Sequence, residues 1–328
     1  PLRNLALLPF HHIFGFVAVF LWYTFFQKTV VYPESLAPSA VTALVREAGV
    51  THIFSVPLLW NGIAARCARL AEAGGPSARA LQPILNAAEE EDPEKYRRSV
   101  RRIPGFVKKR VREGIFGDGV RFLISGGSYI SPRTLRVLNA MGYPLYNGYG
   151  LTEAGITSVE LVPTPAARTA GNIGVPLTLV EYRLKDGSLQ VRSPQIAKGS
   201  MQSGRFVPLD APEGWLDTGD IAKEENGRLV VTGRKKEIIV TPAGENIPPE
   251  LLEAELGAPE GIKTLCVLGL SMDGGEETVS LVLEPEGALS DAGWRRIHKR
   301  ITEVNGKLPD YMRVRRVYLA RQPVYMTN

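Results

Sequence analysis

Short apolar segments alternate with helical segments through the first half of the chain. Four of these segments have the β-branched and aromatic composition of strands, and they cover residues 5–10, 29–32, 50–57 and 120–125. Residues 39–48, with Ser39 as cap, and residues 131–141, with Pro132 in the first helical position, have the apolar spacing of helices. Strands that alternate with helices pair in parallel and are covered on both faces. The sequence therefore predicts an α/β fold with a parallel sheet.

The composition is that of an ordered, water-soluble chain large enough for more than one domain. It has 328 residues, of which 44% are hydrophobic and 22% charged. The net charge of +5 admits an anionic ligand but does not identify one. The apolar run at residues 13–26 is shorter than the roughly 20 residues of a membrane-spanning helix, so a buried helix is predicted there. Cys67 and Cys266 lie in apolar segments and are expected to be free thiols in a reducing compartment.

The pattern of predicted secondary structure changes twice in the second half of the chain. Short strand-like segments with turn signals at Asp186-Gly187 and Asn226-Gly227 predict a β-rich subdomain at residues 166–235. From residue 236 to residue 328 the pattern is that of a separate small α+β domain, whose helix at 291–306 has apolar residues at spacings of three and four. Residues 1–165 would then form the α/β subdomain, and residues 1–235 one large domain.

The stretch at 147–155 combines several residue types that could bind a ligand. It combines glycines, which let the backbone approach a ligand closely, with an aromatic ring, a hydroxyl and a carboxylate. Tyr149 offers a flat face, Thr152 a hydroxyl that suits a phosphate, and Glu153 a hard oxygen ligand for Mg²⁺. Taken alone, the same residues equally describe a glycine-rich turn.

Two further clusters decide between these interpretations. They are Gly-Trp-Leu-Asp-Thr-Gly-Asp at residues 214–220 and Gly-Arg-Lys-Lys-Glu-Ile-Ile at residues 233–239. With the first stretch, in this order and at these distances, they resemble the signature motifs of the adenylate-forming (AMP-binding) superfamily. The charged insertion at residues 72–118 and the segment at 57–63 resemble the long-chain fatty acyl-CoA synthetases within it. The implied fold is the later part of the large domain, a parallel sheet with helices plus a β-rich subdomain, followed by the small C-terminal domain.

The resemblance implies a nucleotide site. Tyr149 would pack against adenine, Thr152 would bond the α-phosphate, Glu153 would help to hold Mg²⁺, and Asp220 and Arg234 would bind the ribose. The full set of implied nucleotide-binding residues is Gly126, Gly127, Ser128, Asn147, Gly148, Tyr149, Gly150, Thr152, Asp220 and Arg234.

Three more positions receive roles from the same resemblance. His12 matches the histidine beside the acyl carboxylate, with His11 in the preceding position, and is a catalytic candidate together with Thr152 and Glu153. Lys236 matches the hinge about which the small domain rotates. Gly244 and Glu245 match the loop that lines the tunnel for the acceptor thiol.

Two departures from the family pattern concern the ends of the chain. The phosphate-cradling loop of the family lies upstream of the histidine, and nothing of that kind is present. The catalytic lysine follows the phrase Pro-x-x-x-Thr-Asn, which matches residues 323–328, where the sequence stops. We therefore expect a chain truncated at both ends, which binds adenylate poorly and scarcely catalyses adenylation by itself.

The implied function is ATP-dependent activation of a carboxylic acid, a fatty acid in the first instance, followed by transfer to CoA. The cofactors are ATP or AMP, Mg²⁺ and CoA. One alternative passes the acyl group to the phosphopantetheine of a carrier protein, and another is a non-catalytic relative that binds nucleotide weakly. The expected location is cytoplasmic, and oligomeric state and acyl chain length are not readable.

The basic residues between 97 and 112 raise one further question. Aromatic residues that could stack on bases are sparse there, so a solvated helical surface is predicted and nucleic acid is not expected as a partner. Peripheral contact of this surface with an anionic membrane is a hypothesis.

Overall fold

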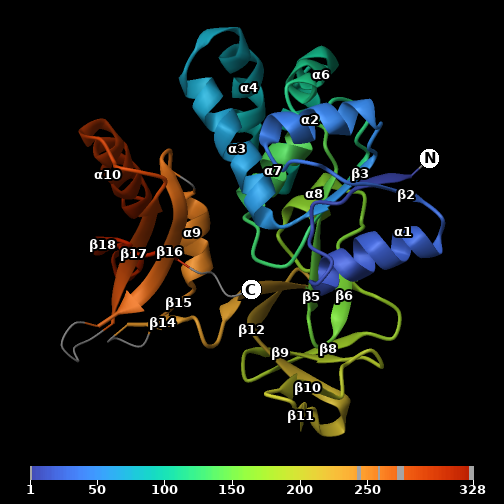
Figure 1. Ribbon diagram of the computed structural model, residues 1–328. Helices are drawn as coiled ribbons and strands as arrows, with labels where there is room; N and C mark the ends of the chain where they lie inside the picture. The colour runs from blue at the N-terminus through green and yellow to red at the C-terminus, as the bar shows by residue number, and fades with distance from the viewer. Residues whose placement is uncertain (1, 242–244, 258, 272–276, 325–328) are drawn as a thin grey trace. The chain divides into compact units, whose positions relative to one another are not determined.

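The computed structural model describes residues 2–241, 245–257, 259–271 and 277–324 (Figure 1). The chain divides into two compact units. The first unit comprises Pro1–Thr218 and Ala222–Val231, and the second comprises Gly219–Ile221 and Thr232–Asn328. Each unit is described by itself.

A seven-stranded mixed sheet organises the first unit. Its strand order is β2-β1-β3-β4-β5-β6-β7, and the five strands from β2 to β5 are mutually parallel whereas β6 and β7 are antiparallel to their neighbours. The bounds are β1 Arg3–Leu5, β2 Thr29–Val31, β3 His52–Ser55, β4 Phe122–Ser125, β5 Leu145–Leu151, β6 Gly155–Val159 and β7 Val175–Pro176. The predicted parallel sheet is thus confirmed, although the strand predicted for residues 5–10 is displaced: β1 covers Arg3–Leu5 and does not continue to residue 10.

Both faces of this sheet are covered, as expected. Ile53 and Leu123 point into a core that contains Trp60 of helix α3. Their strand neighbours Phe54 and Ile124 point the other way, into a core with residues of the first helix. This alternation follows from the two-residue period of a strand. The helices of the first core include α2 Pro38–Glu47, α3 Pro57–Glu72, α4 Gly75–Ala88, α5 Pro93–Arg102, α6 Gly105–Glu113 and α7 Pro132–Ala140.

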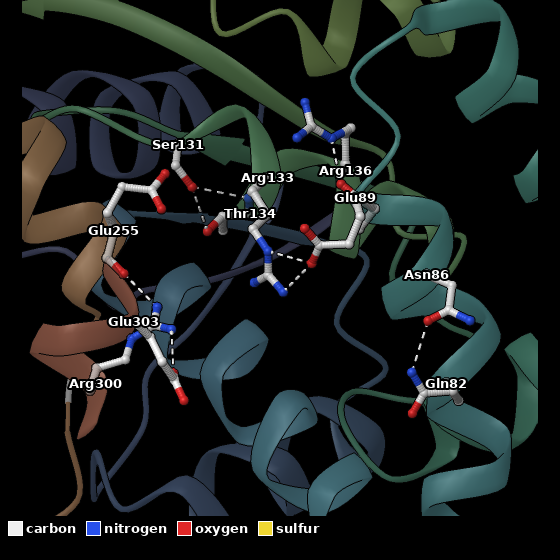
Figure 2. A network of polar contacts seen from close by, with 11 residues as sticks. Gln82, Asn86, Glu89, Ser131, Arg133, Thr134, Arg136, Glu255, Arg300 and Glu303 are labelled. Atoms are coloured by element: carbon white, nitrogen blue, oxygen red, sulfur yellow. Dashed lines mark hydrogen bonds and ion pairs between the residues drawn. The ribbon is translucent and has the colours of Figure 1, made fainter. Parts of the chain in front are cut away.

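Helix α7 begins as predicted, with Pro132 in its first turn. Ser131 caps it by accepting a hydrogen bond from the Thr134 backbone N–H at 3.1 Å, and Figure 2 shows the two side chains in contact. Arg133 on the same helix pairs with Glu89 at the end of α4, at 2.6 Å (Figure 2). The capping prediction for α2 is wrong, because that helix begins at Pro38 with Ala37 as N-cap and no side-chain cap.

The apolar run at residues 13–26 forms a π-helix, η1 Gly15–Leu21, continued by α1 Trp22–Phe25. The prediction of a buried helix is correct for only one of its faces. Phe14, Val19 and Tyr23 are buried against the sheet, whereas Phe16, Phe20, Leu21, Trp22, Phe25 and Phe26 are exposed. No helix among the described residues is both long and apolar enough to cross a membrane.

Strands dominate the chain from the short helix α8 Pro165–Thr169 to Arg234. A four-stranded sheet has the order β13-β12-β9-β8, and β10 and β11 form a separate hairpin. The bounds are β8 Glu181–Lys185, β9 Ser188–Arg192, β10 Gly199–Gln202, β11 Arg205–Pro208, β12 Trp215–Glu225 and β13 Arg228–Arg234. Asp186 and Gly187 make the predicted turn with φ values of 51° and 75°.

The second unit packs two helices on a three-stranded sheet. The sheet order is β16-β17-β18, with bounds β16 Ile262–Leu270, β17 Thr278–Pro285 and β18 Arg316–Leu319. The strands β14 Ile239–Val240 and β15 Asn246–Ile247 pair separately. Helices α9 Pro249–Leu256 and α10 Asp291–Asn305 place Leu252, Ile297 and Ile301 in the core. The Arg300 side chain donates to the last carbonyls of α9, to that of Glu255 (Figure 2) and to that of Leu256 at 3.1 Å.

Each unit contains one free cysteine. Cys67 is buried in α3 of the first unit, and Cys266 is half-buried in β16 of the second. Burial raises the pKa of each thiol to about 11, so at neutral pH both groups are thiols and not thiolates.

Candidate functional site

The glycine-rich stretch forms the hairpin between β5 and β6. At Gly150 a Cβ atom would lie 2.4 Å from the carbonyl oxygen of Gly155, a distance that no side chain tolerates. Gly155 itself has a φ of 69°, in the left-handed region that favours glycine. The register of the pair shifts between Tyr149 and Gly150. The glycines therefore fix a tight, irregular backbone at this point.

The tip of this hairpin presents two polar side chains to solvent. Thr152 and Glu153 are exposed, and Ala154 between them and β6 is buried. The backbone of the tip is held by hydrogen bonds from Ala154 N to Leu151 O at 3.1 Å and from Ala197 N to Glu153 O at 2.7 Å. Two consecutive residues at the tip thus expose a hydroxyl and a carboxylate, and hydrogen bonds fix the backbone that holds them.

Tyr149 lies on β5, three residues before Thr152 at the tip, and is half-buried. The edge of its ring packs on Tyr182 with the ring centroids 6.3 Å apart. The Tyr182 hydroxyl donates to Thr157 Oγ1 at 2.6 Å and lies 3.0 Å from Ser158 Oγ, and burial raises its pKa. Tyr182 therefore anchors the Tyr149 ring to the hairpin and to strand β8.

The turn at Gly126, Gly127 and Ser128 directly follows β4 and touches the base of the hairpin. A Cβ atom on Gly126 would lie 3.1 Å from Phe14 Cε1 and 3.4 Å from the carbonyl oxygen of Gly148. The adjoining strands are in register, with Ser125 paired to Asn147. In open α/β sheets ligands collect at the carboxyl ends of the parallel strands, which is where this turn lies.

Asn147 connects the hairpin base to a segment whose part in the site the sequence did not indicate. Its side-chain amide donates to the backbone carbonyl of Asn172 at 2.9 Å, and Asn172 is buried. The sequence pattern Gly-Asn-Ile-Gly at residues 171–174 is a signal that could have drawn attention to this segment.

His12 lies immediately before the η1–α1 helix and is half-buried, whereas His11 is exposed. Its Nδ1 accepts a hydrogen bond from Phe14 N at 3.4 Å, which leaves the proton of a neutral ring on Nε2. Because Phe14 also packs against Gly126, the histidine segment and the Gly-Gly-Ser turn belong to one neighbourhood. A Cβ atom on Gly15 would lie 2.4 Å from the Pro9 carbonyl oxygen, so this bend also needs a glycine.

Asp220 and Arg234 form an ion pair in the second unit. Arg234 Nε donates to Asp220 Oδ1 at 3.1 Å, and the Asp220 residue is only 4% exposed. The structure thus brings together the two residues that the resemblance assigns to the ribose. Half of the Arg234 side chain remains exposed, with 53% of its surface accessible.

Lys236 is exposed in a turn at residues 235–237. Two backbone N–H groups, those of Glu237 and Ile238, donate to the Arg234 carbonyl oxygen at 3.1 Å. Gly244 lies outside the described residues. Glu245 donates its backbone N–H to Thr241 Oγ1 at 3.1 Å, and its carboxylate accepts from the same hydroxyl.

The carboxylate of Glu153 is the candidate ligand for Mg²⁺. The described residues contain no group of three or more His, Cys, Asp or Glu side chains arranged to hold a metal ion. Mg²⁺ in nucleotide sites takes most of its ligands from water and phosphate and only one or two from protein carboxylates. The exposed carboxylate of Glu153 beside the Thr152 hydroxyl fits that requirement.

The sequence and the fold together identify the class of protein. The chain matches the AMP-binding enzyme family over residues 2–201. It therefore belongs to the AMP-binding enzyme family.

Curated relatives of the chain are CoA ligases that are named for different acids. A 2-succinylbenzoate–CoA ligase of Listeria monocytogenes is 30% identical over 162 residues, which is 49% of this chain and 34% of that protein. A long-chain-fatty-acid–CoA ligase of Mycobacterium bovis is 33% identical over 167 residues, which is 50% of this chain and 27% of that protein. The chain thus aligns with about a third of the length of these relatives.

Solved structures with the same fold extend over almost the whole chain. The O-succinylbenzoate coenzyme A synthetase of Bacillus subtilis, in complex with ATP and magnesium ion, has a TM-score of 0.61 at 22% identity, covering 97% of this chain and 58% of that one. An amide bond synthetase of Marinactinospora thermotolerans has a TM-score of 0.60 at 24% identity, covering 99% of this chain and 60% of that one. These similarities confirm the predicted fold class.

Proposed function

We propose that the protein containing this chain activates a carboxylic acid with ATP and transfers the acyl group to CoA. The observation that carries the proposal is the β5–β6 hairpin of a member of the AMP-binding family, which displays Thr152 and Glu153 at its tip and touches the Gly126–Ser128 turn at its base. The CoA ligases among its relatives support the same assignment.

Adenylation joins two anions, the carboxylate and the α-phosphate, so the site must hold the nucleotide and neutralise negative charge. In the proposed arrangement Tyr149 packs against adenine beside the Gly126–Ser128 turn. The Thr152 hydroxyl donates to the α-phosphate, and Glu153 holds Mg²⁺. The bound ion would withdraw charge from the phosphates as pyrophosphate leaves.

The remaining contacts in the proposal come from charged groups elsewhere in the chain. Asp220 accepts hydrogen bonds from the ribose hydroxyls, and Arg234, with its exposed guanidinium, donates to the same sugar. His12, with a proton on Nε2, donates to the acyl carboxylate and orients it.

Transfer to the thiol would use the small domain, which we assign to residues 236–328. In this proposal the domain rotates about Lys236, whose place in an exposed turn supports a hinge. The loop with Gly244 and Glu245 then lines the path of the acceptor thiol. Replacing Lys236 by proline should impair thioester formation more than adenylation, and equal loss of both half-reactions would exclude the hinge.

A fatty acid is the substrate that we favour. One relative is named as a long-chain-fatty-acid–CoA ligase, and the helix after His12 exposes the stacked rings of Phe16 and Phe20, whose centroids are 5.9 Å apart. An aromatic acid is the second candidate, since other relatives are named for succinylbenzoate and indoleacetate. A competition assay between a fatty and an aromatic acid separates the two. The proposed location is the cytoplasm.

Two other functions remain as alternatives. Transfer to a carrier-protein phosphopantetheine is excluded if thioester formation requires free CoA. A non-catalytic role is excluded by any acid-dependent ATP–pyrophosphate exchange in the protein that contains this chain.

The deciding experiment compares ATP–pyrophosphate exchange in the parent protein with that of its T152V and E153Q variants. Loss of either transition-state contact should lower the rate by about 100-fold. The matched control is E224Q, which neutralises an exposed carboxylate outside the hairpin and should leave the rate unchanged. Equal rates in all four proteins would exclude the proposed site.

A further inference from the structure

Helix α9 begins with a buried carboxylate oxygen that lacks a donor in the part of the chain that the structure describes. Glu250 lies in the first turn of this helix, and its Oε2 is buried without a hydrogen-bond partner among these residues. The side chain that faces it is Glu237, from the turn at residues 235–237. Two carboxylates cannot hydrogen-bond to one another unless one of them carries a proton. A hydrogen bond between these two side chains therefore requires a proton on one of the carboxylates.

The described residues around Glu250 include further acidic groups. Glu253, one turn along α9, accepts a hydrogen bond from Val267 N at 2.8 Å, and the Cys266 thiol lies next to it. Burial, with Glu237 and Glu253 adding to it, raises the pKa of Glu250 to about 7.

The charged groups on the adjoining elements are engaged elsewhere or face water. Arg234 pairs with Asp220, Lys263 of β16 pairs with Glu284, and Arg300 of α10 binds the far end of α9. Glu277, directly before β17, accepts from Val240 N of β14, and Glu245, directly before β15, is bonded to Thr241. Lys236 is exposed in the turn, and Lys235 beside it makes a contact of its own.

From this geometry we propose that Glu237 and Glu250 share one proton and form a pH-sensitive clasp between the 235–237 turn and helix α9. With the proton in place, one carboxyl group donates to the other and the turn is held against the helix. When the proton leaves, two negative charges face each other and the turn is released. The proton passes from the carboxyl group to solvent, and no covalent bond changes.

The clasp has a consequence for the reaction only if the proposed function holds. Glu237 directly follows Lys236, so release of the turn would free the proposed hinge. The balance between the two half-reactions would then shift with pH. The clasp itself requires neither nucleotide nor a moving domain.

Hydrogen exchange of two backbone amides tests the clasp without any substrate. The Glu237 and Ile238 amides, which bond to the Arg234 carbonyl oxygen, report on the turn. After correction for intrinsic exchange, their protection should fall by about tenfold between pH values of about 6 and 8.5. In E250Q the glutamine amide donates to Glu237 at every pH, so protection should stay high throughout.

Two more variants make the result decisive. E237Q places the amide on the exposed partner and should remove the pH dependence in the same way, which keeps the test valid if E250Q does not fold. The control E255Q neutralises an exposed acid on the same helix and should behave like the unaltered chain. Protection that does not change with pH in the unaltered chain, or that changes equally in E237Q, overturns the clasp. Because no nucleotide is used, such a result would leave the proposed function standing.

Discussion

Glu153 at the tip of the β5–β6 hairpin and Glu250 at the start of helix α9 are both carboxylates next to a turn, but their surroundings are opposite. Glu153 is exposed, and the backbone beneath it is fixed by glycines that accept no side chain. Glu250 is half-buried, and its Oε2 is buried without a donor among the described residues. At the hairpin the path of the backbone is constrained, whereas at α9 the environment of the carboxylate side chain is constrained.

This contrast separates two ways to prepare a charged group. A carboxylate that waits for an external ligand stays in water, and its position depends on the path of the chain. A carboxylate that acts inside the protein is desolvated, and its charge depends on its neighbours. Substitutions should therefore affect stability through backbone geometry at the hairpin and through ionisation at α9.

The largest effect on stability is expected at Gly150. In G150A the new Cβ would lie 2.4 Å from the Gly155 carbonyl oxygen, so the hairpin must distort, and the free energy of unfolding should fall by about 3 kcal/mol. Urea unfolding measures this. The control is G62A in helix α3, where nothing lies within 4 Å and alanine should stabilise by about 0.5 kcal/mol. Similar values for both variants would show that the hairpin backbone is not constrained.

A smaller loss is expected from D220A. Asp220 is buried and paired with Arg234, so its removal should lower the free energy of unfolding by about 2 kcal/mol. E181A breaks the exposed pair with Arg192 and should cost less than about 0.5 kcal/mol. If the two variants lose the same stability, burial does not strengthen the Asp220 pair.

At α9 the effect should change with pH. The pKa of Glu250 is about 7 in the folded chain and 4.5 in the absence of burial, so between these values the folded chain binds the extra proton. Its stability therefore falls as pH rises through this window. E250Q removes the cost of the charge, and at pH about 8 it should be more stable than the unaltered chain by about 1 kcal/mol, discounted for partial solvent screening. E255Q should show no such gain, and a gain independent of pH in E250Q would contradict the ionisation argument.

The smallest stability effects are expected at the hairpin tip. T152V and E153Q alter exposed side chains without touching the glycines, so each should change the free energy of unfolding by less than about 0.5 kcal/mol. The same variants should lose Mg²⁺-dependent nucleotide binding in the parent protein, which calorimetry measures. A large loss of stability would mean that these side chains hold the hairpin together.

Much of the fold follows from the sequence because periodicity reports burial. The β-branched and aromatic composition around Ile53 and Leu123 predicted strands, and the spacing of Ile297 and Ile301 predicted the buried face of α10. The apolar run after His12 was less informative, since Phe16 and Phe20 have the same character as the buried Phe14 and Val19. Composition does not distinguish the exposed face of an all-apolar helix from its buried face.

For the candidate site the sequence was most informative where glycines constrain the backbone. Gly126, Gly150 and Gly155 mark close approaches that the structure contains. The Glu237–Glu250 pair could not be found in the same way. Its members are 13 positions apart in different elements, and nothing in the residue types indicates which glutamates face each other or lack a donor.

The placement of the two cysteines offers a chemical probe of each unit. Cys67 lies in the core of the first unit and Cys266 in a strand of the second, and burial keeps both as poorly reactive thiols. An alkylating reagent should therefore modify each cysteine mainly when its own unit opens. Peptide mass spectrometry of the two alkylation rates would then give separate opening kinetics for the two units from one sample, with no engineered label.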